Sequence, residues 1–499
     1  MSAAGTGQTV AIARVREALG RHAIRPRAVR ADSRRVQPGD LFFALPGQRT
    51  DGRRFIDAAI AAGACAVLCE TGGAPAGAPV PVIEVDHLRA HAGALADALL
   101  DHPSAALHVI GITGTNGKTS VSQWIAQAMN ALGTRCGVIG TLGCGLPGQL
   151  AESANTTPDV VSVHQTLADL RAAGATACAM EVSSIGLDQG RIDGVRIHTA
   201  AFTNLTRDHL DYHPDMQHYG AAKAALFSRP GLQAAVINTD DAFGRALATA
   251  TAARLPVTGC ALDVDLPASV SGLRARNVDP AHGLHFDIEQ GDARAVVDAA
   301  LVGRFNVQNL LAVTGCLLHA GVQLTDAARV AGTLVPPPGR MQRLGGRGEP
   351  LVVVDYAHTP DALEQALRAL QPVAAARGGR LLCVFGCGGD RDPGKRPLMG
   401  AVAYEHAART WITSDNPRSE NPDTILDDIA AGLPACADVQ RERDRAVAIR
   451  AAVTGADLRD VVLIAGKGHE PYQEVAGVRT PWSDADQVAA ALAARGGVQ

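Results

Sequence analysis

Apolar residues along the middle of the chain form short runs that alternate with longer amphipathic segments. The runs have the length of buried strands and fall at residues 107–112, 137–140, 175–182, 198–203 and 234–238. The segments between them have the length and period of helices. Such alternation predicts a parallel sheet covered by helices.

Similar patterns lie on both sides of this region. Residues 1–105 contain apolar runs at 41–45, 66–69 and 80–85, separated by turn residues. Pro336-Pro337-Pro338 cannot continue a helix, and after it strands are expected at 351–355, 380–385, 410–413 and 461–465. The sequence therefore predicts an α/β protein with three domains, at residues 1–105, 106–338 and 339–499.

Composition and charge narrow the class of protein. The 499 residues include 46 Lys and Arg against 50 Asp and Glu, a formal net charge of −4. This balance argues against a protein that coats nucleic acid or anionic lipid. We find no apolar run of membrane-spanning length, no signal-peptide pattern at the N-terminus, and no Cys-x-x-Cys pair among the ten cysteines. A cytoplasmic monomer without a membrane anchor is expected.

The strongest local motif is the glycine-rich segment from Gly111 to Thr119, which joins an apolar strand to an amphipathic helix. Its backbone N–H groups can converge on phosphate oxygens, Lys118 can reach the outer phosphates, and Thr119 can ligate Mg²⁺. The leading glycine stands one residue earlier than the usual phosphate-loop spacing requires. The loop predicts a nucleoside triphosphate site, and by itself leaves open a helicase, a GTPase-like switch, a kinase or a ligase.

The segment from Thr113 to Thr119 resembles the phosphate loop of the Mur ligases and the related folylpolyglutamate synthetases. Further motifs that resemble these ligases follow one another in order along nearly the whole chain. Among them are Asp32-Ser33-Arg34, Asn155-Thr156-Thr157, Glu181-Val182-Ser183-Ser184, Gly339-Arg340-Met341, Asp355-Tyr356-Ala357-His358, Asp415-Asn416-Pro417-Arg418 and Gly466-Lys467-Gly468-His469-Glu470. Together they most resemble the diaminopimelate-adding members of the Mur ligases.

The resemblance implies a fold and a reaction. A central ATPase domain, with a parallel sheet and a phosphate loop, would be flanked by an N-terminal α/β domain for a UDP substrate and a C-terminal Rossmann-like domain. ATP would phosphorylate the terminal carboxylate of UDP-N-acetylmuramoyl-L-alanyl-D-glutamate to an acyl phosphate. An amine of meso-2,6-diaminopimelate would then attack it, giving an amide in peptidoglycan precursor synthesis.

The resemblance also implies the residues that bind ATP and Mg²⁺. Lys118, Glu181, His209 and Lys223 would be the catalytic group. Mg²⁺ would be held by Thr119, Glu181 and Lys223, the lysine being modified by CO₂ to a carbamate (N6-carboxylysine), and His209 would be a ligand of a second magnesium. The ATP site would contain Gly114, Thr115, Asn116, Gly117, Lys118, Thr119, Ser120, Asn306, Arg340, Asp355 and His358.

Two further substrate sites are implied. The UDP substrate would contact Ser33, Gln48, Arg49, Thr50, Asn155, Thr156, Thr157, Ser183, Gln189 and Arg191. Diaminopimelate would contact Arg391, Asp415, Asn416, Pro417, Arg418, Gly466 and Glu470. A guanidinium can grip the second carboxylate, which diaminopimelate has and lysine lacks. The chain departs from the family pattern at Ile185, where these ligases usually have histidine.

Considered without the resemblance, several of these residues have plainer interpretations. A glutamate at a strand end, such as Glu181, is often a solvated residue. Lys223 lies in an alanine-rich segment and would be an ordinary helix lysine. His209 and His213 have zinc-ligand spacing, but Pro214 argues against a continuing helix, so a zinc site is rejected. His213 and His218 are expected to be structural or surface residues.

Three alternative functions are kept. The first is the lysine-adding Mur ligase, against which Arg418 argues. The second is a folylpolyglutamate synthetase, against which the N-terminal unit and the arginine pair argue. The third is a non-catalytic nucleotide-binding switch, which would have no need of Lys118, Glu181 and Lys223 together.

Overall fold

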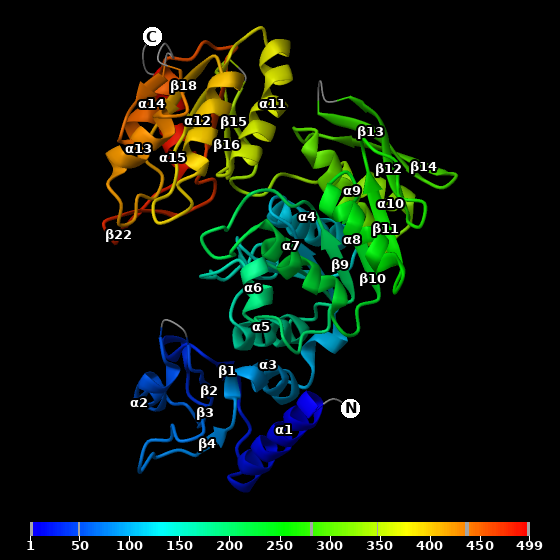
Figure 1. Cartoon of the computed structure of the whole chain (residues 1–499), viewed down its shortest axis with the longest axis vertical. Coiled ribbons are helices and arrows are strands. Elements are labelled where there is room, and N and C mark those ends of the chain that lie inside the picture. The colour runs from blue at the N-terminus through cyan, green and yellow to red at the C-terminus, as the bar shows by residue number, and fades with distance from the viewer. Residues whose placement is uncertain (1–2, 48–49, 280–282, 347, 435–438, 497–499) are drawn as a thin grey trace. The chain divides into compact units, whose positions relative to one another are not determined.

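The computed structural model describes residues 3–47, 50–279, 283–346, 348–434 and 439–496 (Figure 1). By its internal contacts the chain forms two compact units. The first unit contains residues 1–113, 125–201 and 222–235, and the second contains residues 114–124, 202–221 and 236–499. Together the elements form the three-domain α/β architecture that the sequence predicts, and the exact domain boundaries stay a prediction.

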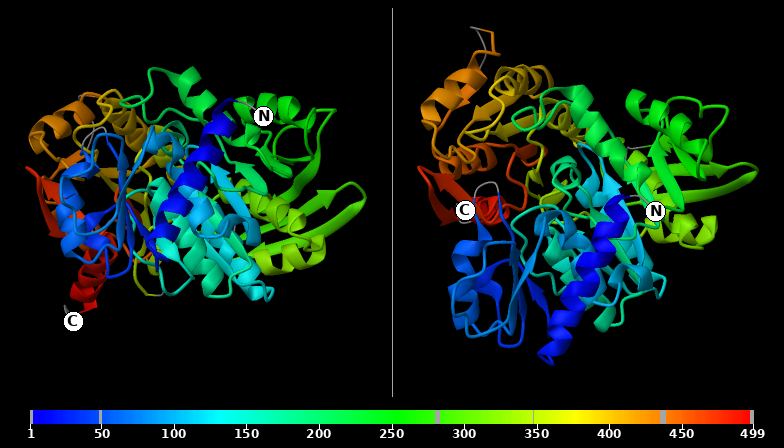
Figure 2. Two further views of the ribbon diagram at one scale, coloured as in Figure 1. Left: turned by 90° about the horizontal axis from the view of Figure 1, so that it is seen from below. Right: turned by 60° about the horizontal axis from the view of Figure 1, so that its bottom comes forward.

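A four-stranded parallel sheet lies near the start of the chain, with strand order β1-β2-β3-β4. Its elements are α1 (Ala3–Arg21), β1 (Val29–Arg30), η1 (Ser33–Arg35), β2 (Leu41–Ala44), η2 (Gly52–Phe55), α2 (Ile56–Ala61), β3 (Ala66–Glu70), β4 (Val82–Val85), α3 (Leu88–Leu99) and η3 (Pro103–Ala106). Helix α1, which begins next to the N label in Figure 2, packs against α3.

Both faces of this sheet are buried, and this explains its continuous apolar runs. Leu41 and Phe43 of β2 point into a cluster with residues of α1 and α3. Phe42 and Ala44 point to the opposite face, where they pack with Ile56 and other residues of α2. Successive side chains of a strand alternate between faces, so a strand covered on both sides must be apolar at every position.

The middle of the chain builds a ten-stranded sheet of order β14-β13-β12-β11-β10-β9-β5-β8-β6-β7. Its strands are β5 (His108–Thr113), β6 (Cys136–Gly140), β7 (Gly143–Gly145), β8 (Ala177–Glu181), β9 (Thr199–Phe202), β10 (Ala234–Asn238), β11 (Val257–Ala261), β12 (Ser271–Asp279), β13 (Leu284–Gln290) and β14 (Ala293–Ala299). Its helices are α4 (Lys118–Ala131), α5 (Val160–Ala172), α6 (Ser184–Asp188), α7 (Met216–Ala224), η4 (Ala225–Ser228), α8 (Ala242–Ala252), α9 (Phe305–His319) and α10 (Leu324–Ala331). The five strands predicted for this region are confirmed.

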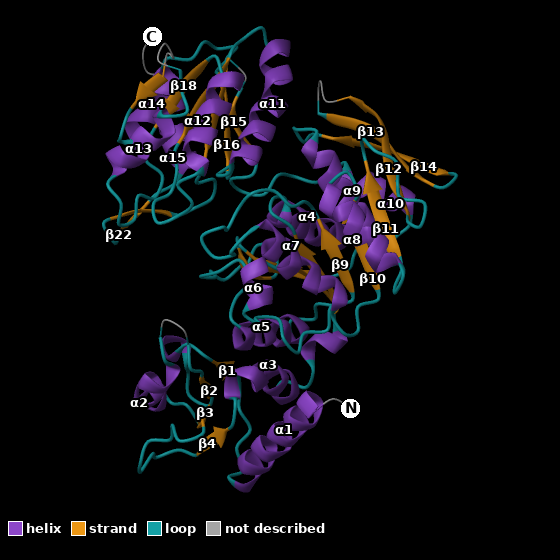
Figure 3. Ribbon diagram, in the orientation of Figure 1, coloured by secondary structure: helices purple, strands orange, loops and turns teal. Residues whose placement is uncertain are grey.

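An antiparallel extension of this sheet was not predicted. Strands β12, β13 and β14 pair antiparallel, and α10 packs on β14 (Figure 3). The hairpin turns on Gly291 and Asp292 between the paired residues Gln290 and Ala293. A Gly-Asp pair followed by alternating buried and exposed positions, as in β14, is the local signal that could have revealed it.

The last part of the chain forms a six-stranded sheet of order β15-β16-β20-β17-β18-β19, parallel except for β15. Its strands are β15 (Gln342–Gly345), β16 (Leu351–Asp355), β17 (Leu381–Phe385), β18 (Arg409–Ile412), β19 (Val439–Arg441) and β20 (Val461–Ala465), and a separate hairpin joins β21 (Tyr472–Val475) to β22 (Val478–Pro481). The helices are α11 (Pro360–Ala376), α12 (Lys395–His406), α13 (Pro422–Ala430), α14 (Arg445–Thr454) and α15 (Asp484–Gly496).

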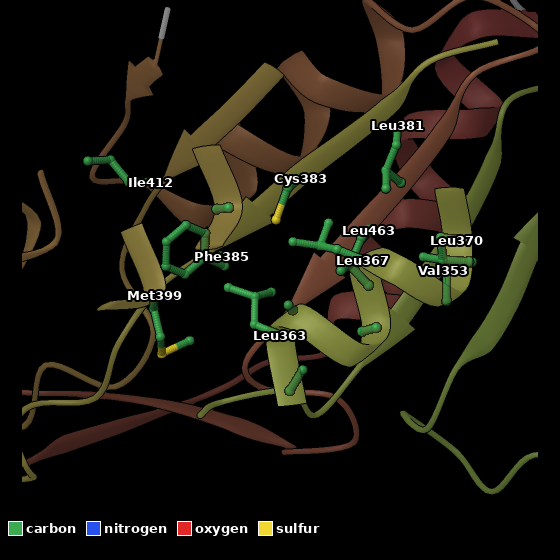
Figure 4. Packing of buried hydrophobic residues seen from close by; sticks show 14 of the residues in the cluster. Val353, Leu363, Leu367, Leu370, Leu381, Cys383, Phe385, Met399, Ile412 and Leu463 are labelled. Carbon is green, nitrogen blue, oxygen red and sulfur yellow. The ribbon is translucent and has the colours of Figure 1, made fainter. Parts of the chain in front are cut away.

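This sheet too is buried on both faces. Leu363 and Leu367 of α11 pack with Cys383, Phe385 and Leu463 on one face (Figure 4). Residues of α14 and α15 cover the other face. The loops that follow β18 and β20 therefore begin at strands that are packed on both faces. Doubly wound sheets carry their functional loops at these carboxyl ends. None of the helices in the described part of the chain combines the length and hydropathy that a membrane crossing requires.

Candidate active site

The phosphate loop lies between the end of β5 and the first residue of α4. Gly114 and Gly117 have φ values of +148° and +87°, which side-chain-bearing residues rarely adopt. A Cβ atom at Gly114 would also overlap the hydroxyl of Thr203. The segment after β9 fixes the loop, because the N–H groups of Thr115 and Asn116 donate to the backbone and side-chain oxygens of Asn204, at 2.8 and 2.9 Å. The glycine positions of the motif are thus required by the geometry.

Two side chains of α4 face this loop. Lys118 Nζ donates to the carbonyl oxygens of Gly114 and Thr115, at 2.9 and 2.8 Å. Thr119 is buried, and its hydroxyl accepts a hydrogen bond of 3.2 Å from Arg340 Nη2. The guanidinium of Arg340 lies over the ring of Tyr356, 4.4 Å from its centroid. The positively charged guanidinium of Arg340 is therefore held beside Thr119, the candidate Mg²⁺ ligand.

A cavity of about 320 Å³ opens next to the phosphate loop, and all its lining residues belong to the second unit. Six predicted ATP-site residues line it, namely Asn116, Gly117, Ser120, Asn306, Arg340 and Asp355. Sequence reasoning missed others that also line it, including Trp124, Asp240, Arg304, Gln308, Tyr356, Asp361 and Gln365. The size and mixed lining suit a small polar ligand with a flat ring.

Two carboxyl groups at this cavity, those of Asp355 and Asp361, are half-buried. Asp355 accepts hydrogen bonds from the N–H groups of Met341 and Ala357, at 2.7 and 2.8 Å, and burial raises the pKa of its carboxyl group. Burial also raises the pKa of Asp361, which accepts from the side-chain amide of Asn116 at 3.2 Å. The hydrogen bond between Asn116 and Asp361 joins the phosphate loop to helix α11 within the second unit.

Asp208 lies between two of the predicted residues, His209 and His358. Its Oδ2 atom is 3.6 Å from His209 Nε2 and 3.7 Å from His358 Nε2. Burial opposes ionisation of Asp208, but the nearby His358 and His209 side chains outweigh it and lower its pKa. His209 has a left-handed φ of +53° and lies outside any helix, in agreement with the rejection of a zinc-binding helix.

Glu181 is fully buried at the carboxyl end of β8, not a solvated strand end. Its Oε1 accepts from the N–H of Thr141 at 2.8 Å, and its Oε2 lies 3.1 Å from the Thr141 hydroxyl. That hydroxyl also lies 3.0 Å from the hydroxyl of Thr156. Gly140 is needed here, since a Cβ atom would overlap Glu181. The buried carboxylate is thus held by hydroxyl and amide groups.

The predicted UDP-substrate residues fall into two places in the first unit. Thr157, Ser183, Gln189 and Arg191 form one hydrogen-bonded group next to Glu181, in which Arg191 Nη1 donates to the Thr157 carbonyl at 2.7 Å. Asn155 lines a second cavity, of about 310 Å³, together with Asp32 and Arg35 on either side of Ser33. Thr50 is exposed, and Gln48 and Arg49 lie outside the described residues. Ile185 is partly buried in α6.

The predicted amino-acid residues meet in the loops that follow β18 and β20. Glu470 Oε2 accepts from Asn416 Nδ2 at 2.7 Å and from Lys467 Nζ at 2.8 Å. Lys467 also donates to Asn416 Oδ1 at 3.0 Å and lies 3.7 Å from Asp415. A Cβ atom at Gly466 would come within 2.6 Å of Asp415 Oδ2. Sequence reasoning missed Lys467, because nothing in its local pattern indicates that its side chain is fully buried.

The two predicted arginines flank this group. Arg418 Nη1 donates to the carbonyl of Gly389 at 2.7 Å. Hydrogen bonds link its backbone to the β21–β22 hairpin at Glu474 and Ala476, and Pro417 is buried beside it. Arg391 Nη1 lies 3.2 Å from Asp211 Oδ2. Both guanidiniums remain partly exposed to solvent, where a carboxylate could reach them.

The interpretation of Lys223 as an ordinary helix lysine is wrong as regards burial. It lies in α7 and is only 1% exposed. Lysines are almost never buried to this extent unless something compensates the charge or removes it. His213 is buried against Tyr212 and Tyr219, and His218 is exposed beside Asp215, as expected for structural and surface residues.

Three family models match the chain. They are the "Mur ligase family, catalytic domain" over residues 26–99, the "Mur ligase middle domain" over 112–317 and the "Mur ligase, glutamate ligase domain" over 339–468. A protein of Ralstonia nicotianae is 53% identical over 478 residues, which cover 93% of both chains. The chain belongs to the Mur ligase family.

Individual relatives of this Mur ligase have one name in common. The Ralstonia protein and one from Pseudomonas aeruginosa, 51% identical over 94% of this chain and 95% of its own, are both named UDP-N-acetylmuramoyl-L-alanyl-D-glutamate--2,6-diaminopimelate ligase. A solved structure with that name matches with a TM-score of 0.64 and 36% identity, covering 95% of this chain and 96% of its own. Folylpolyglutamate synthase of Mycobacterium tuberculosis, with a TM-score of 0.58 and 20% identity over 75% and 91% of the chains, shares the fold.

Proposed function

We propose that this Mur ligase joins meso-2,6-diaminopimelate to UDP-N-acetylmuramoyl-L-alanyl-D-glutamate with hydrolysis of ATP, in peptidoglycan precursor synthesis. The observation that carries the proposal is 51–53% identity, over nearly the whole chain, to proteins with the corresponding ligase name. The polar loops after β18 and β20 support it, because they offer separate partners for an ammonium and a carboxylate.

The reaction proceeds in two steps in this proposal. A terminal carboxylate oxygen of the UDP substrate attacks the γ-phosphorus of ATP, which releases ADP and gives an acyl phosphate. The unprotonated amine of diaminopimelate then attacks the acyl carbon. The tetrahedral intermediate loses the amine proton, its C–O bond to phosphate breaks, and amide and phosphate are the products.

The phosphate loop would bind the ATP phosphates through the N–H groups of residues 114–119, with Lys118 moving from its two carbonyl partners to the outer phosphates. Arg340 lies close enough to Thr119 to stabilise the charge of the transferred group. Asn306, Asp355 and His358 would complete the nucleotide site, with the adenosine in the 320 Å³ cavity.

The donor atoms of the site fit magnesium. Mg²⁺ prefers oxygen ligands and is usually held by one or two carboxylates together with substrate phosphates and water. Glu181 offers a buried carboxylate and Thr119 a buried hydroxyl. Within the described residues, no group of three or more His, Cys, Asp or Glu side chains could hold a metal by itself. Bound Mg²⁺ would neutralise phosphate charge; the family resemblance implies carbamylated Lys223 as a further ligand and His209 as a ligand of a second Mg²⁺.

We expect native mass spectrometry to show that Lys223 carries one CO₂. A buried lysine with a carbamate becomes an anion with two oxygen ligands, which suits a nearby dication better than an ammonium does. The protein kept at pH 8 with bicarbonate should be heavier by about 44 Da, a covalent mark lost in acid. Lys223→Ala is the matched control, and an unmodified wild-type protein at saturating bicarbonate would contradict the assignment.

The UDP substrate would lie along the residues of the first unit. Ser33, Gln48, Arg49 and Thr50 would hold the uridine nucleotide, and Asn155 would contact the part of the substrate that follows it. Thr156, Thr157, Ser183, Gln189 and Arg191, which lie beside Glu181, would contact the remainder of the substrate up to its terminal carboxylate. Ile185 in place of histidine would make the wall of this site less polar.

The amino acid would bind in the loops after β18 and β20. Asp415 and Glu470 carry two negative charges against the single positive charge of Lys467, so one negative charge remains to attract a substrate ammonium. Asn416, Pro417 and Gly466 would shape this end of the site. Arg391 and Arg418 would bind the carboxylates of diaminopimelate. The proposal includes a monomeric protein in the cytoplasm.

Phosphate release from ATP tests this function directly. We expect turnover that requires both the UDP-muramoyl dipeptide and meso-diaminopimelate. L-lysine should be at least about 10³-fold poorer as a substrate, because it has no second carboxylate and leaves an arginine of the site unpaired. Amide formation is confirmed by the mass of the product. Turnover with L-lysine alone would favour the lysine-adding alternative. ATP hydrolysis without amide product would favour the nucleotide-binding switch.

A further inference from the structure

Arg445 and Asp484 form a fully buried ion pair at the carboxyl edge of the six-stranded sheet. Both side chains have no exposed surface. The contact is bidentate, with Arg445 Nε donating to Asp484 Oδ1 at 2.8 Å and Nη2 donating to Oδ2 at 2.7 Å. Trp482 Nε1 donates to the same Oδ1 at 2.8 Å. The two residues are the first of helices α14 and α15, which pack side by side.

This arrangement is not explained by helix stability. An arginine in the first turn of a helix faces the positive end of the helix dipole, which disfavours a cation. A buried ion pair is in general weak support for stability, because the desolvation of both charges offsets their attraction. Placing Arg445 at this position therefore needs another reason.

The guanidinium also contacts the two loops that carry the proposed amino-acid site. Nη2 donates to the carbonyl of Ala465 at 2.9 Å, and Nη1 donates to the carbonyl of Ser414 at 3.4 Å. Ala465 directly precedes Gly466, and Ser414 directly precedes Asp415. Strands β18 and β20 are not neighbours, since β17 lies between them. One side chain thus links two loops that the sheet does not join.

The charge of Arg445 acts at the same place. Burial opposes the charge of Arg445, but the charge and hydrogen bonds of Asp484, followed by the charges of Asp415 and Glu470, outweigh burial and raise the pKa of the guanidinium. The ion pair of Arg445 and Asp484 carries no net charge. The negative charge of Asp415 and Glu470 therefore remains available to a ligand, while the hydrogen bonds of Arg445 orient the loops.

We propose that Arg445, held by Asp484 and Trp482, is a positioning residue that fixes the spacing of the two loops binding the amino-acid substrate. It does not touch the substrate, and it acts through the backbone of Ser414 and Ala465. The inference rests on the proposed function and adds to it the device that sets the distance between Asp415 and Glu470. Only a planar fork can hold Asp484 and both carbonyls at once.

Steady-state kinetics of Arg445→Lys in the full-length protein test the proposal. Lysine keeps the charge and can pair with Asp484, but cannot reach both carbonyls. We expect the KM for the amino acid to rise about 10- to 100-fold, as for a displacement of about 1 Å, while the KM for ATP and for the UDP substrate stays within about twofold. Trp482→Phe removes one hydrogen bond to Asp484 and should raise the same KM about threefold.

Asp460→Asn is the matched control. Asp460 is buried at the other end of β20. Its carboxylate accepts hydrogen bonds from the backbone N–H of Arg380 at 2.7 Å and from Arg380 Nη2 at 3.0 Å. We expect it to lower the melting temperature without changing any KM. A merely structural role for Arg445 would give the same result in Arg445→Lys, and that outcome overturns the inference.

The remaining outcomes are also decisive. If Arg445→Lys does not fold, Trp482→Phe decides, and an unchanged amino-acid KM in that variant overturns the inference. If the wild-type protein uses L-lysine in place of diaminopimelate, the proposed function is overturned and this inference is not. The KM shift of the variants is then measured with L-lysine. Wild-type turnover of diaminopimelate with an unchanged KM in the variants would overturn this inference only.

Discussion

Lys118→Met should reduce ATP-dependent phosphate release by about 10³-fold, the loss typical of removing one electrostatic contact to a transition state. Methionine keeps the unbranched stem and removes the charge. In the structure Lys118 Nζ is held by two carbonyl oxygens of its own loop, at 2.9 and 2.8 Å. It is therefore already next to the place where phosphates would bind, and the expected loss is mainly in kcat. The malachite-green phosphate assay under saturating substrates measures it.

Ser122→Ala is the control for this prediction. Ser122 lies in the same helix and donates to the carbonyl of Thr119 at 3.1 Å, yet it does not line the 320 Å³ cavity beside the phosphate loop. Its loss should leave kcat within about threefold, the effect of one neutral hydrogen bond. A small effect of Lys118→Met, or an equal effect of both substitutions, would contradict the role assigned to Lys118.

Local sequence patterns were sufficient for the parts of the fold that are locally determined. The strand at 351–355 was predicted because both faces of β16 are buried, so its first four residues, 351–354, form a continuous apolar run. The phosphate loop was predicted because Gly114 and Gly117 adopt backbone angles that favour glycine. In both cases the physical requirement acts on neighbouring residues and is therefore visible in the sequence.

Other features depend on residues that are distant in the chain. The burial of Lys223 and of Lys467 follows from packing against other segments, and the local pattern of each is that of an ordinary surface lysine. Asp361 reaches the phosphate loop from α11, and Arg445 meets Asp484 across 39 residues. Only the folded structure reveals such pairs, because the cost of burying a charge is met by a partner far away in the sequence. The roles assigned to the individual site residues stay predictions until tested.

Arg418→Ala should lower the preference for meso-diaminopimelate over L-lysine by about 10²- to 10⁴-fold, because the second carboxylate loses its partner. The substitution removes the guanidinium and should leave the backbone conformation unchanged. Arg418 has a φ of +52°, which alanine and arginine adopt at similar cost. Its backbone contacts, from N–H to the Glu474 carbonyl at 3.0 Å and from the Ala476 N–H to its own carbonyl at 2.7 Å, need no side chain. The loop should therefore keep its shape.

Competition between the two amino acids in one reaction, read by product mass, measures this preference. Arg479→Ala is the matched control, since Arg479 belongs to the β21–β22 hairpin that the Arg418 backbone contacts, but pairs with Glu474 and stacks 4.3 Å from the centroid of Tyr472. We expect its selectivity to equal that of the wild type. The KM for ATP should not change in Arg418→Ala, because the guanidinium of Arg418 contacts Gly389 and does not line the 320 Å³ cavity. An equal loss of ATP binding would mean that Arg418 supports the fold of the site and does not select the amino acid.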